Sequence, residues 1–189
     1  MIMPYFILIP LGAAFLTCLA GRNNRHLPAV LGMISGVVLL FLALASFVLV
    51  GKNGGRILYT TGGWEIPWTI GFVLDYLSSF LLVTIGLITV ASLVYSLSYM
   101  TRYTDLWKYY ALFQLMLAGM NGFVLTGDLF NLFVFMEIAL LSAYALVGYG
   151  CEAEELEAAF KYTVMGAVTS TMILLGIGLI YALASTLNM

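Results

Sequence analysis

Charged residues are scarce in this sequence of 189 residues: Asp, Glu, Lys and Arg together make up only 8% of it, whereas about 25% is usual in a soluble domain. Histidine occurs once and cysteine twice, and none of the three has a neighbouring ligand at metal spacing. The net charge is −2 and no basic cluster is present, which excludes nucleic acid as a partner. With no nucleotide-binding loop and no nucleophile next to a base, we expect no covalent catalysis, no metal and no cofactor.

The single histidine and the two cysteines are each expected to have a structural position and no chemical role. His26 lies in a short polar loop, where a surface position is expected. Cys18 lies in an apolar run and is expected to pack there, while Cys151 lies in a loop that we place on the cytoplasmic side. Because thiols stay reduced in the cytoplasm, we predict no disulfide.

Hydrophobic residues dominate what remains, at 63% of the chain. A helix needs about 20 apolar residues to cross a bilayer, and six runs approach or exceed that length. They cover approximately residues 2–20, 27–50, 72–100, 107–125, 129–149 and 158–183. We therefore predict an all-α integral membrane protein with about six transmembrane helices in one domain over residues 1–189, multi-pass in the cell membrane and in contact with lipid.

The glycine-rich segment 51–71 interrupts the apolar pattern between the second and third runs. Alternating Ile57 and Tyr59, followed by the pair Gly62 and Gly63, predict a short hairpin or an extended loop there. Five of the basic residues fall in or beside the first, third and fifth loops, and only Lys52 and Arg56 fall in the second. Since basic residues concentrate in cytoplasmic loops, segment 51–71 is expected to be extracytoplasmic and both termini to lie outside.

Glu137 is the main candidate for chemistry, because it lies near the middle of the fifth run. A charge at a helix centre costs about 2.5–3.5 kcal/mol on the insertion scale, and the apolar residues around it compensate for the helix as a whole. A carboxyl group that can change protonation in a dry interior is what a proton relay needs. The alternative is a glutamate that only holds helices together.

Lys161 stands at the start of the sixth run, in EAAFKYTVMGAV. It could point inward toward Glu137 and hold it charged or accept its proton. It could equally extend to the cytoplasmic interface, as long basic side chains do near helix ends.

Other polar residues of the apolar runs have structural interpretations. Asp75 and Asp128 stand at helix starts, where a carboxylate can cap the first turn. Gln114, Asn121 and Asn131 are expected to form hydrogen bonds between helices.

Residues 109–150, YYALFQLMLAGMNGFVLTGDLFNLFVFMEIALLSAYALVGYG, resemble the D-type antiporter-like subunits of Mrp-type cation/proton antiporters. This family is related to the proton-pumping subunits of respiratory complex I and of membrane-bound hydrogenases. The motifs GFVLDYLSSF, YSLSYM and EAAFKYTVMGAVTS are similar to the same family. The resemblance implies that Glu137 belongs to the ion path, and that Lys161 matches a lysine that recurs near the start of the sixth helix.

The sequence departs from this family in its extent. The resemblance implies inverted repeats of five helices, the first beginning at the fourth helix, and a broken seventh helix with a central lysine. This chain stops after its sixth run, so it matches only the N-terminal portion. We therefore expect a subunit of a large hetero-oligomeric membrane complex, in which Glu137 and Lys161 contribute to a proton or sodium path that another chain completes. The alternatives are a non-conducting structural subunit of a respiratory, hydrogenase or antiporter complex, and an independent small channel or carrier.

Overall fold

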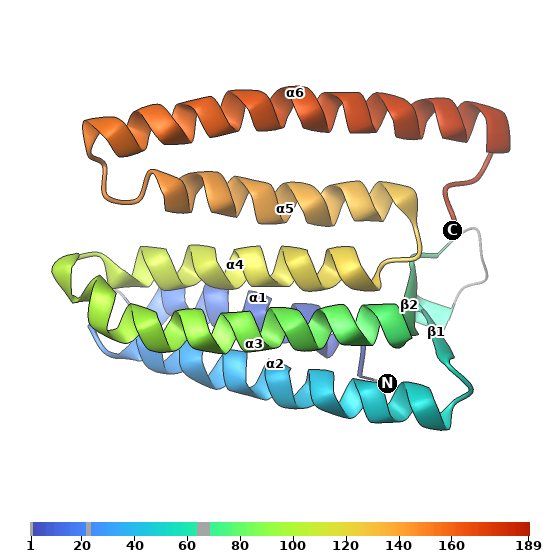
Figure 1. Cartoon of the computed structure of the whole chain (residues 1–189), viewed down its shortest axis with the longest axis horizontal. Coiled ribbons are helices and arrows are strands. Elements are labelled where there is room, and N and C mark those ends of the chain that lie inside the picture. Colours follow the sequence, from blue (N-terminus) through green and yellow to red (C-terminus); the bar gives the residue numbers. More distant parts are fainter. Residues whose placement is uncertain (1, 22–23, 64–68) are drawn as a thin grey trace.

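The computed structural model describes residues 2–21, 24–63 and 69–189, and within these ranges it is built of long, nearly parallel or antiparallel helices (Figure 1). The helices are α1 Tyr5–Ala20, α2 Leu27–Lys52, α3 Tyr76–Tyr99, α4 Leu106–Leu125, α5 Leu129–Val147 and α6 Ala153–Ala184. A 3₁₀ turn, η2 Met100–Arg102, follows α3.

The helices form a bundle of two unequal parts. The helices α1, α2, α3 and α4 pack on one another around a common core, and α5 packs against α4. The last helix, α6, packs chiefly against α5, so it forms the outer edge of the bundle (Figure 1). One side of α5 and most of α6 consequently lie outside the four-helix core.

The predicted start of the third helix at residue 72 is wrong. Residues 71–75 form a strand, and the helix begins only at Tyr76. Strand β1 (Arg56–Thr60) pairs antiparallel with strand β2 (Gly71–Asp75), and a short 3₁₀ turn, η1 (Thr61–Gly63), follows β1. The expected hairpin is therefore present, but its second strand uses residues that the apolar pattern assigns to a helix. The reason is that β2 is apolar throughout its middle, so the sequence gives no period that separates strand from helix there.

Both predicted helix caps are confirmed. The side chain of Asp75 accepts a hydrogen bond from the backbone N–H of Ser78 at 2.7 Å, and that of Asp128 accepts one from Asn131 at 2.8 Å. Each carboxylate satisfies a donor that the first turn of a helix leaves free. Asp128 thereby fixes the start of α5, the helix that carries Glu137.

The sixth helix begins five residues before the predicted residue 158, at Ala153. Its first turn contains Glu154 and Glu155, whose negative charges favour the N-terminal end of a helix. At the other end, Ser185 adopts a left-handed conformation and stops the helix. The last residues then return to the start of α5, where the Met189 N–H donates to the Gly127 carbonyl at 2.8 Å.

Hydrogen bonds between helices hold the four-helix core, as predicted for two of the three amides. The Gln114 amide donates to the Gly32 carbonyl at 3.2 Å and accepts from Ser35 at 3.0 Å, which joins α4 to α2. Asn121 donates to the Phe6 carbonyl of α1 at 2.9 Å. The prediction for Asn131 is wrong, because its side-chain nitrogen is buried without a partner among the described residues.

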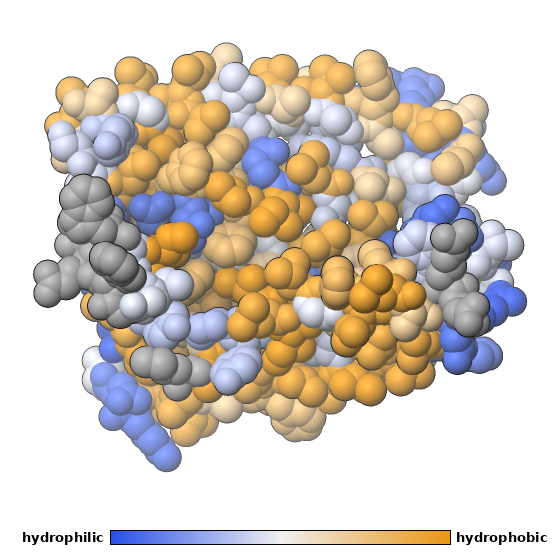
Figure 2. Space-filling view, turned by 180° about the vertical axis from the view of Figure 1, so that it is seen from behind, coloured by the Kyte–Doolittle hydropathy of each residue, from blue (hydrophilic) through white to orange (hydrophobic). Residues whose placement is uncertain are grey.

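The molecule has the surface of a multi-pass membrane protein. Four helices, α2, α3 (with η2), α5 and α6, are long and apolar enough to cross a bilayer. Figure 2 shows hydrophobic residues over most of the middle of one face, with a few hydrophilic ones among them. The termini lie at the end of the bundle that carries the β1–β2 hairpin (Figure 1). The six membrane crossings and the external position of the termini stay predictions. The position of both termini at one end of the bundle agrees with an even number of crossings.

Candidate functional site in the α5–α6 interface

Glu137 lies at the centre of α5, and one of its carboxylate oxygens is buried. Its Oε1 atom has no hydrogen-bond partner among the described residues. A polar atom that is buried without a partner is uncommon in native proteins, and such atoms concentrate where water, an ion or a reacting group belongs. The structure therefore leaves Glu137 with unused hydrogen-bonding capacity in the middle of an apolar helix.

Tyr144 lies two helical turns after Glu137 on the same face of α5, because residues seven apart on a helix are aligned. Its ring meets that of Tyr162 edge to face, with centroids 4.7 Å apart, and its hydroxyl lies against Gly166. Both of these contacts are on α6. The face of α5 that carries Glu137 is therefore the face that packs on α6.

The register of the two antiparallel helices places Ser170 at the level of Glu137. A Cβ on Gly148 would lie 3.1 Å from the Cβ of Ala159, so these two positions face each other. Glu137 stands eleven residues before Gly148, and Ser170 stands eleven residues after Ala159. Ser170 is buried with 6% exposure, and its hydroxyl also lacks a partner among the described residues.

Lys161 does not lie against Glu137. Its side chain is 70% exposed and forms an ion pair with Glu157, one turn earlier on α6. By the same register Lys161 lies about nine residues from Glu137, or about 13 Å along the helix axis. The structure thus shows an exposed lysine that pairs within α6 and does not contact Glu137.

The close approach of α5 to α4 fixes the rotation of α5. A Cβ on Gly119 would lie 2.6 Å from the Ala139 nitrogen and 2.8 Å from the Phe135 carbonyl oxygen. A Cβ on Gly122 would overlap the Phe135 ring. Because α5 has its backbone against α4 on one side, its Glu137 face is directed to α6.

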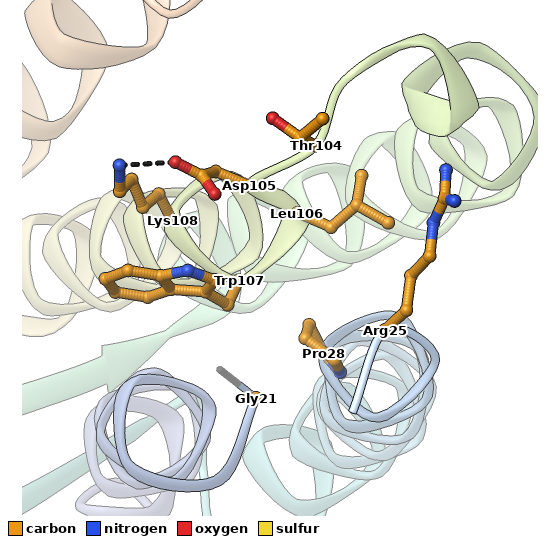
Figure 3. A pocket seen from close by; sticks show the side chains of 8 residues that line it. All are labelled: Gly21, Arg25, Pro28, Thr104, Asp105, Leu106, Trp107 and Lys108. Carbon is orange, nitrogen blue, oxygen red and sulfur yellow. Dashed lines mark hydrogen bonds and ion pairs between the residues drawn. The ribbon is translucent and has the colours of Figure 1, made fainter. Parts of the chain in front are cut away.

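The charged end of the bundle contains a separate cavity, which Figure 3 shows. It measures about 650 Å³ and is lined by Gly21, Arg25, Pro28, Thr104, Asp105, Leu106, Trp107 and Lys108. Arg25 donates to the Thr101 carbonyl at 3.0 Å, and Lys108 pairs with Asp105. These basic groups are occupied by local partners, and the cavity includes neither Glu137 nor Lys161.

Tyr149 connects this end to the end of α5. It lies just beyond the last residue of α5, and its hydroxyl donates to the Asp105 carbonyl at 2.6 Å. Burial, and next the negative charge of Asp105, raise the pKa of Tyr149 to about 12. The phenol therefore stays neutral and keeps its hydrogen bond over the physiological range.

Sequence reasoning identifies Glu137 but misses Ser170 and the role of Tyr144. By sequence, Tyr144 is a packing or interface aromatic, and Ser170 is one of several small polar residues of α6. The spacing of small residues along α6 does indicate which face of this helix packs on a neighbour. Ala159, Gly166 and Ser170 recur at intervals of seven and four, which is typical of a close helix contact.

Known proteins share both the sequence and the fold of this chain. The family described as "NADH:quinone oxidoreductase/Mrp antiporter, TM" matches residues 126–189, and "NADH-Ubiquinone oxidoreductase (complex I), chain 5 N-terminus" matches residues 60–110. The D-type subunit of the Na(+)/H(+) antiporter of Alkalihalophilus pseudofirmus (strain ATCC BAA-2126 / JCM 17055 / OF4) is 32% identical over 160 residues, which cover 83% of this chain and 32% of that protein. The chain belongs to this family of antiporter-like membrane subunits.

Further relatives of the family agree with this assignment. The N-type subunit of the NADH-quinone oxidoreductase of Desulforudis audaxviator (strain MP104C) is 36% identical over 187 residues, or 97% of this chain and 37% of that protein. A chain of the archaeal membrane-bound sulfane sulfur reductase superimposes with a TM-score of 0.91 at 33% identity, covering 99% of this chain and 38% of that one. A chain of the Mrp complex from Dietzia sp. DQ12-45-1b gives 0.87 at 29% identity, covering 99% and 35%.

This antiporter-like chain spans about a third of the length of the relatives it matches and corresponds to their N-terminal portion. The match to residues 126–189 contains α5 and α6, and with them Glu137, Tyr144 and Ser170. The described α5–α6 interface therefore lies within the part of the chain that the family shares.

Proposed function

We propose that this antiporter-like subunit contributes Glu137 to a proton or sodium translocation path in a multi-subunit membrane complex. The observation that carries the proposal is the buried, unpartnered carboxylate oxygen at the centre of α5. An ionisable side chain within a membrane helix is expensive and usually marks an ion path. The relatives named as antiporter and quinone-oxidoreductase subunits support the same assignment.

Lys161 has a secondary part in this proposal. Since it is exposed near the start of α6 and pairs with Glu157, it acts as a charged group at the mouth of the path and not as the direct partner of Glu137. At this distance its charge reaches Glu137 only weakly, because charges near an aqueous surface are screened by water and salt. Its effect on transport is consequently expected to be smaller than that of Glu137.

The rest of the path comes from outside this chain in our proposal. The relatives are about three times as long as the matched region, and α6 exposes a largely apolar surface along its outer side. We propose that another chain carries the later helices and covers this surface. Mild-detergent purification of the chain from its native membrane, with mass spectrometry of its own intact mass and of its partners, tests this part.

Replacement of Glu137 by Gln in the intact complex tests the central claim. The change keeps the shape of the side chain but removes its proton exchange, so cation-dependent dissipation of a pH gradient in inverted vesicles should fall at least tenfold. Glu154→Gln is the matched control, because Glu154 is an exposed glutamate in the first turn of the neighbouring helix and does not pair with Lys161. Transport at the unsubstituted rate in Glu137→Gln would overturn the proposal.

The second candidate is a structural subunit that does not conduct. It is favoured by the separation of Lys161 from Glu137, which leaves no preformed ion pair between them in the described interface. For this function, Glu137→Gln would leave transport intact, while deletion of the chain would prevent assembly of the complex. The Glu137→Gln and deletion variants, measured for transport and for assembly, therefore distinguish the candidates.

A further inference from the structure

The buried hydroxyls of Tyr144 and Ser170 lie near Glu137 in the α5–α6 interface, and the function proposed above does not use them. Tyr144 is 7% exposed and Ser170 is 6% exposed, and the hydroxyl of each lacks a hydrogen-bond partner among the described residues. Burial of a hydroxyl without a partner is unfavourable. Two such groups beside the carboxylate of a membrane helix therefore require an explanation.

The helix register places both hydroxyls within about one turn of Glu137 along the helix axis. Counted from the close approach of Gly148 to Ala159, Ser170 stands at the level of Glu137 on the facing helix. The Tyr144 hydroxyl lies against Gly166, which the same register places about one helical turn from Glu137. A single turn, about 5.4 Å, is a gap that one bridging water can span.

The other buried hydroxyls of the bundle either have a hydrogen-bond partner or lie away from Glu137. Ser142, also on α5, donates to the Ile138 carbonyl at 2.9 Å, and Ser96 bonds with the Tyr110 hydroxyl at 3.1 Å. Thr17 and Ser79 also lack partners, but they lie on α1 and α3, away from the Glu137 face of α5. Two other unpartnered groups, the Asn131 amide nitrogen and a Glu155 carboxylate oxygen, lie in the first turns of α5 and α6. The register therefore places Glu137 in the described chain beside the unpartnered hydroxyls of Tyr144 and Ser170.

We propose that Tyr144 and Ser170 are positioning residues that bind water beside Glu137 and form with it a proton-conducting segment of the α5–α6 interface. Tyr144 extends the segment from Glu137 toward the end of the bundle where Lys161 and Glu157 lie. The inference rests on the proposed role of Glu137 and adds the groups through which its proton moves.

The proton transfer in this segment makes and breaks only O–H bonds. Each hydroxyl or water accepts a proton on an oxygen lone pair and releases its own proton to the next oxygen. When Glu137 is protonated it donates to the bridging water, and when it is ionised it accepts from that water and from Ser170. Atoms and charge balance at every step, and no oxidant or co-reactant is needed.

The first test is spectroscopic and does not depend on transport. The carbonyl stretch of protonated Glu137 is recorded by infrared difference spectroscopy on the purified complex, and it is assigned by its loss in Glu137→Gln. Tyr144→Phe and Ser170→Ala should each shift this band to higher frequency, because the carboxyl group loses hydrogen-bonding partners. An unchanged band in both variants would overturn the proposal.

The second test uses transport in inverted vesicles with two matched controls. Tyr144→Phe and Ser170→Ala should lower the rate about three- to tenfold and increase the solvent deuterium isotope effect. Ser142→Ala removes a hydroxyl that already bonds within α5, and Tyr162→Phe removes one from a residue that is 43% exposed. Both controls should keep the unsubstituted rate and band position.

The outcomes separate this inference from the proposed function. Loss of transport in Glu137→Gln, with Tyr144→Phe and Ser170→Ala equal to their controls in both assays, overturns the inference and leaves the function of Glu137 standing. Intact transport in Glu137→Gln overturns the proposed function. A shifted band in that case would still show that the two hydroxyls hydrate Glu137.

Discussion

The hydroxyl of Tyr144 lies against the backbone of Gly166, so that a tyrosine near the C-terminal end of α5 contacts a glycine of α6. A Cβ at Gly166 would overlap the tyrosine oxygen. The absence of a side chain at this position thus allows the ring to enter the interface. This contact also sets the height at which the Tyr144 hydroxyl stands relative to Glu137.

Gly166→Ala should therefore displace Tyr144 and weaken the α5–α6 interface. Overpacking of this kind usually costs about 1–3 kcal/mol, which exceeds the gain of about 0.5–1 kcal/mol expected for alanine in a helix. Thermal unfolding of the purified protein in detergent measures the effect. Gly176→Ala and Gly178→Ala are the controls, because nothing lies within 4 Å of a Cβ at either site; both should be neutral or stabilising.

Gly119→Ala should be more harmful than Gly166→Ala. The nearest atoms to a Cβ at Gly119 are backbone atoms of Ala139 and Phe135, at 2.6 and 2.8 Å. A flexible side chain can move aside, but backbone atoms can do so only if α4 and α5 separate. We expect a lower melting temperature than for Gly166→Ala in the same assay, and the opposite order would contradict the described packing of α4 on α5.

Much of this fold could be predicted from apolar length and capping chemistry. The runs predicted at residues 107–125 and 129–149 agree with α4 and α5 to within two residues, because Asp128 marks the start of α5 and Gly148 follows its end. Strand β2 escapes prediction because its three central residues are apolar and carry no distinguishing period. The start of α6 escapes it because a run of glutamates is equally typical of a loop.

The site could be predicted only in part, for a physical reason. Glu137 is recognisable because a charge in an apolar run is costly wherever the run packs. The rotation of α5 depends on Gly119 and Gly122 meeting α4, and the partner of Lys161 depends on the direction in which α6 presents it. Both depend on how the helices pack, so Ser170 and Tyr144 can be recognised as neighbours of Glu137 only once the register of α5 and α6 is known.

Lys161→Gln should reduce transport less than Glu137→Gln does. The lysine is separated from Glu137 by about 13 Å along the helix axis and interacts with the exposed Glu157, and such surface pairs contribute only about 0–1 kcal/mol. We expect a decrease of about two- to fivefold in rate, with little change in melting temperature. Lys108→Gln, which removes another exposed paired lysine at the same end, is the control.

A loss in Lys161→Gln as large as that in Glu137→Gln would contradict this prediction. It would mean that the lysine leaves Glu157 and turns toward Glu137 during transport. Glu157→Gln distinguishes that case, since release of the lysine from its partner should then increase the transport rate.

Tyr149 should make the charged end of the bundle sensitive to alkaline pH. Its pKa is raised to about 12 from about 10 in an unfolded chain, so the folded state favours the neutral phenol. The resulting stability is fully present below pH of about 10 and is lost as the pH rises through about 12. Melting temperatures measured from pH of about 8 to about 11 should fall above pH of about 10 in the unsubstituted protein.

Tyr149→Phe should lower the melting temperature at neutral pH and flatten its alkaline decline. The substitution removes the hydrogen bond to the Asp105 carbonyl, which is worth about 1 kcal/mol, together with the titrating group. Tyr181→Phe, an exposed position on α6, serves as the control. An equally steep alkaline decline in Tyr149→Phe would assign that decline to another group.

The orientation of the chain can be measured at Cys151 and at a cysteine introduced at the opposite end of the bundle. Cys151 is free and exposed at the turn between α5 and α6, and Cys18 is exposed on α1. In a Cys18→Ser background, a membrane-impermeant maleimide should label Cys151 in inverted vesicles but not in intact cells, because the basic residues place this end inside. Asn53→Cys, at the exposed hairpin end, in a background without other cysteines, should give the reverse pattern. If Cys151 is labelled from outside, both termini lie inside, and the path from Tyr144 to Glu137 opens toward the external medium.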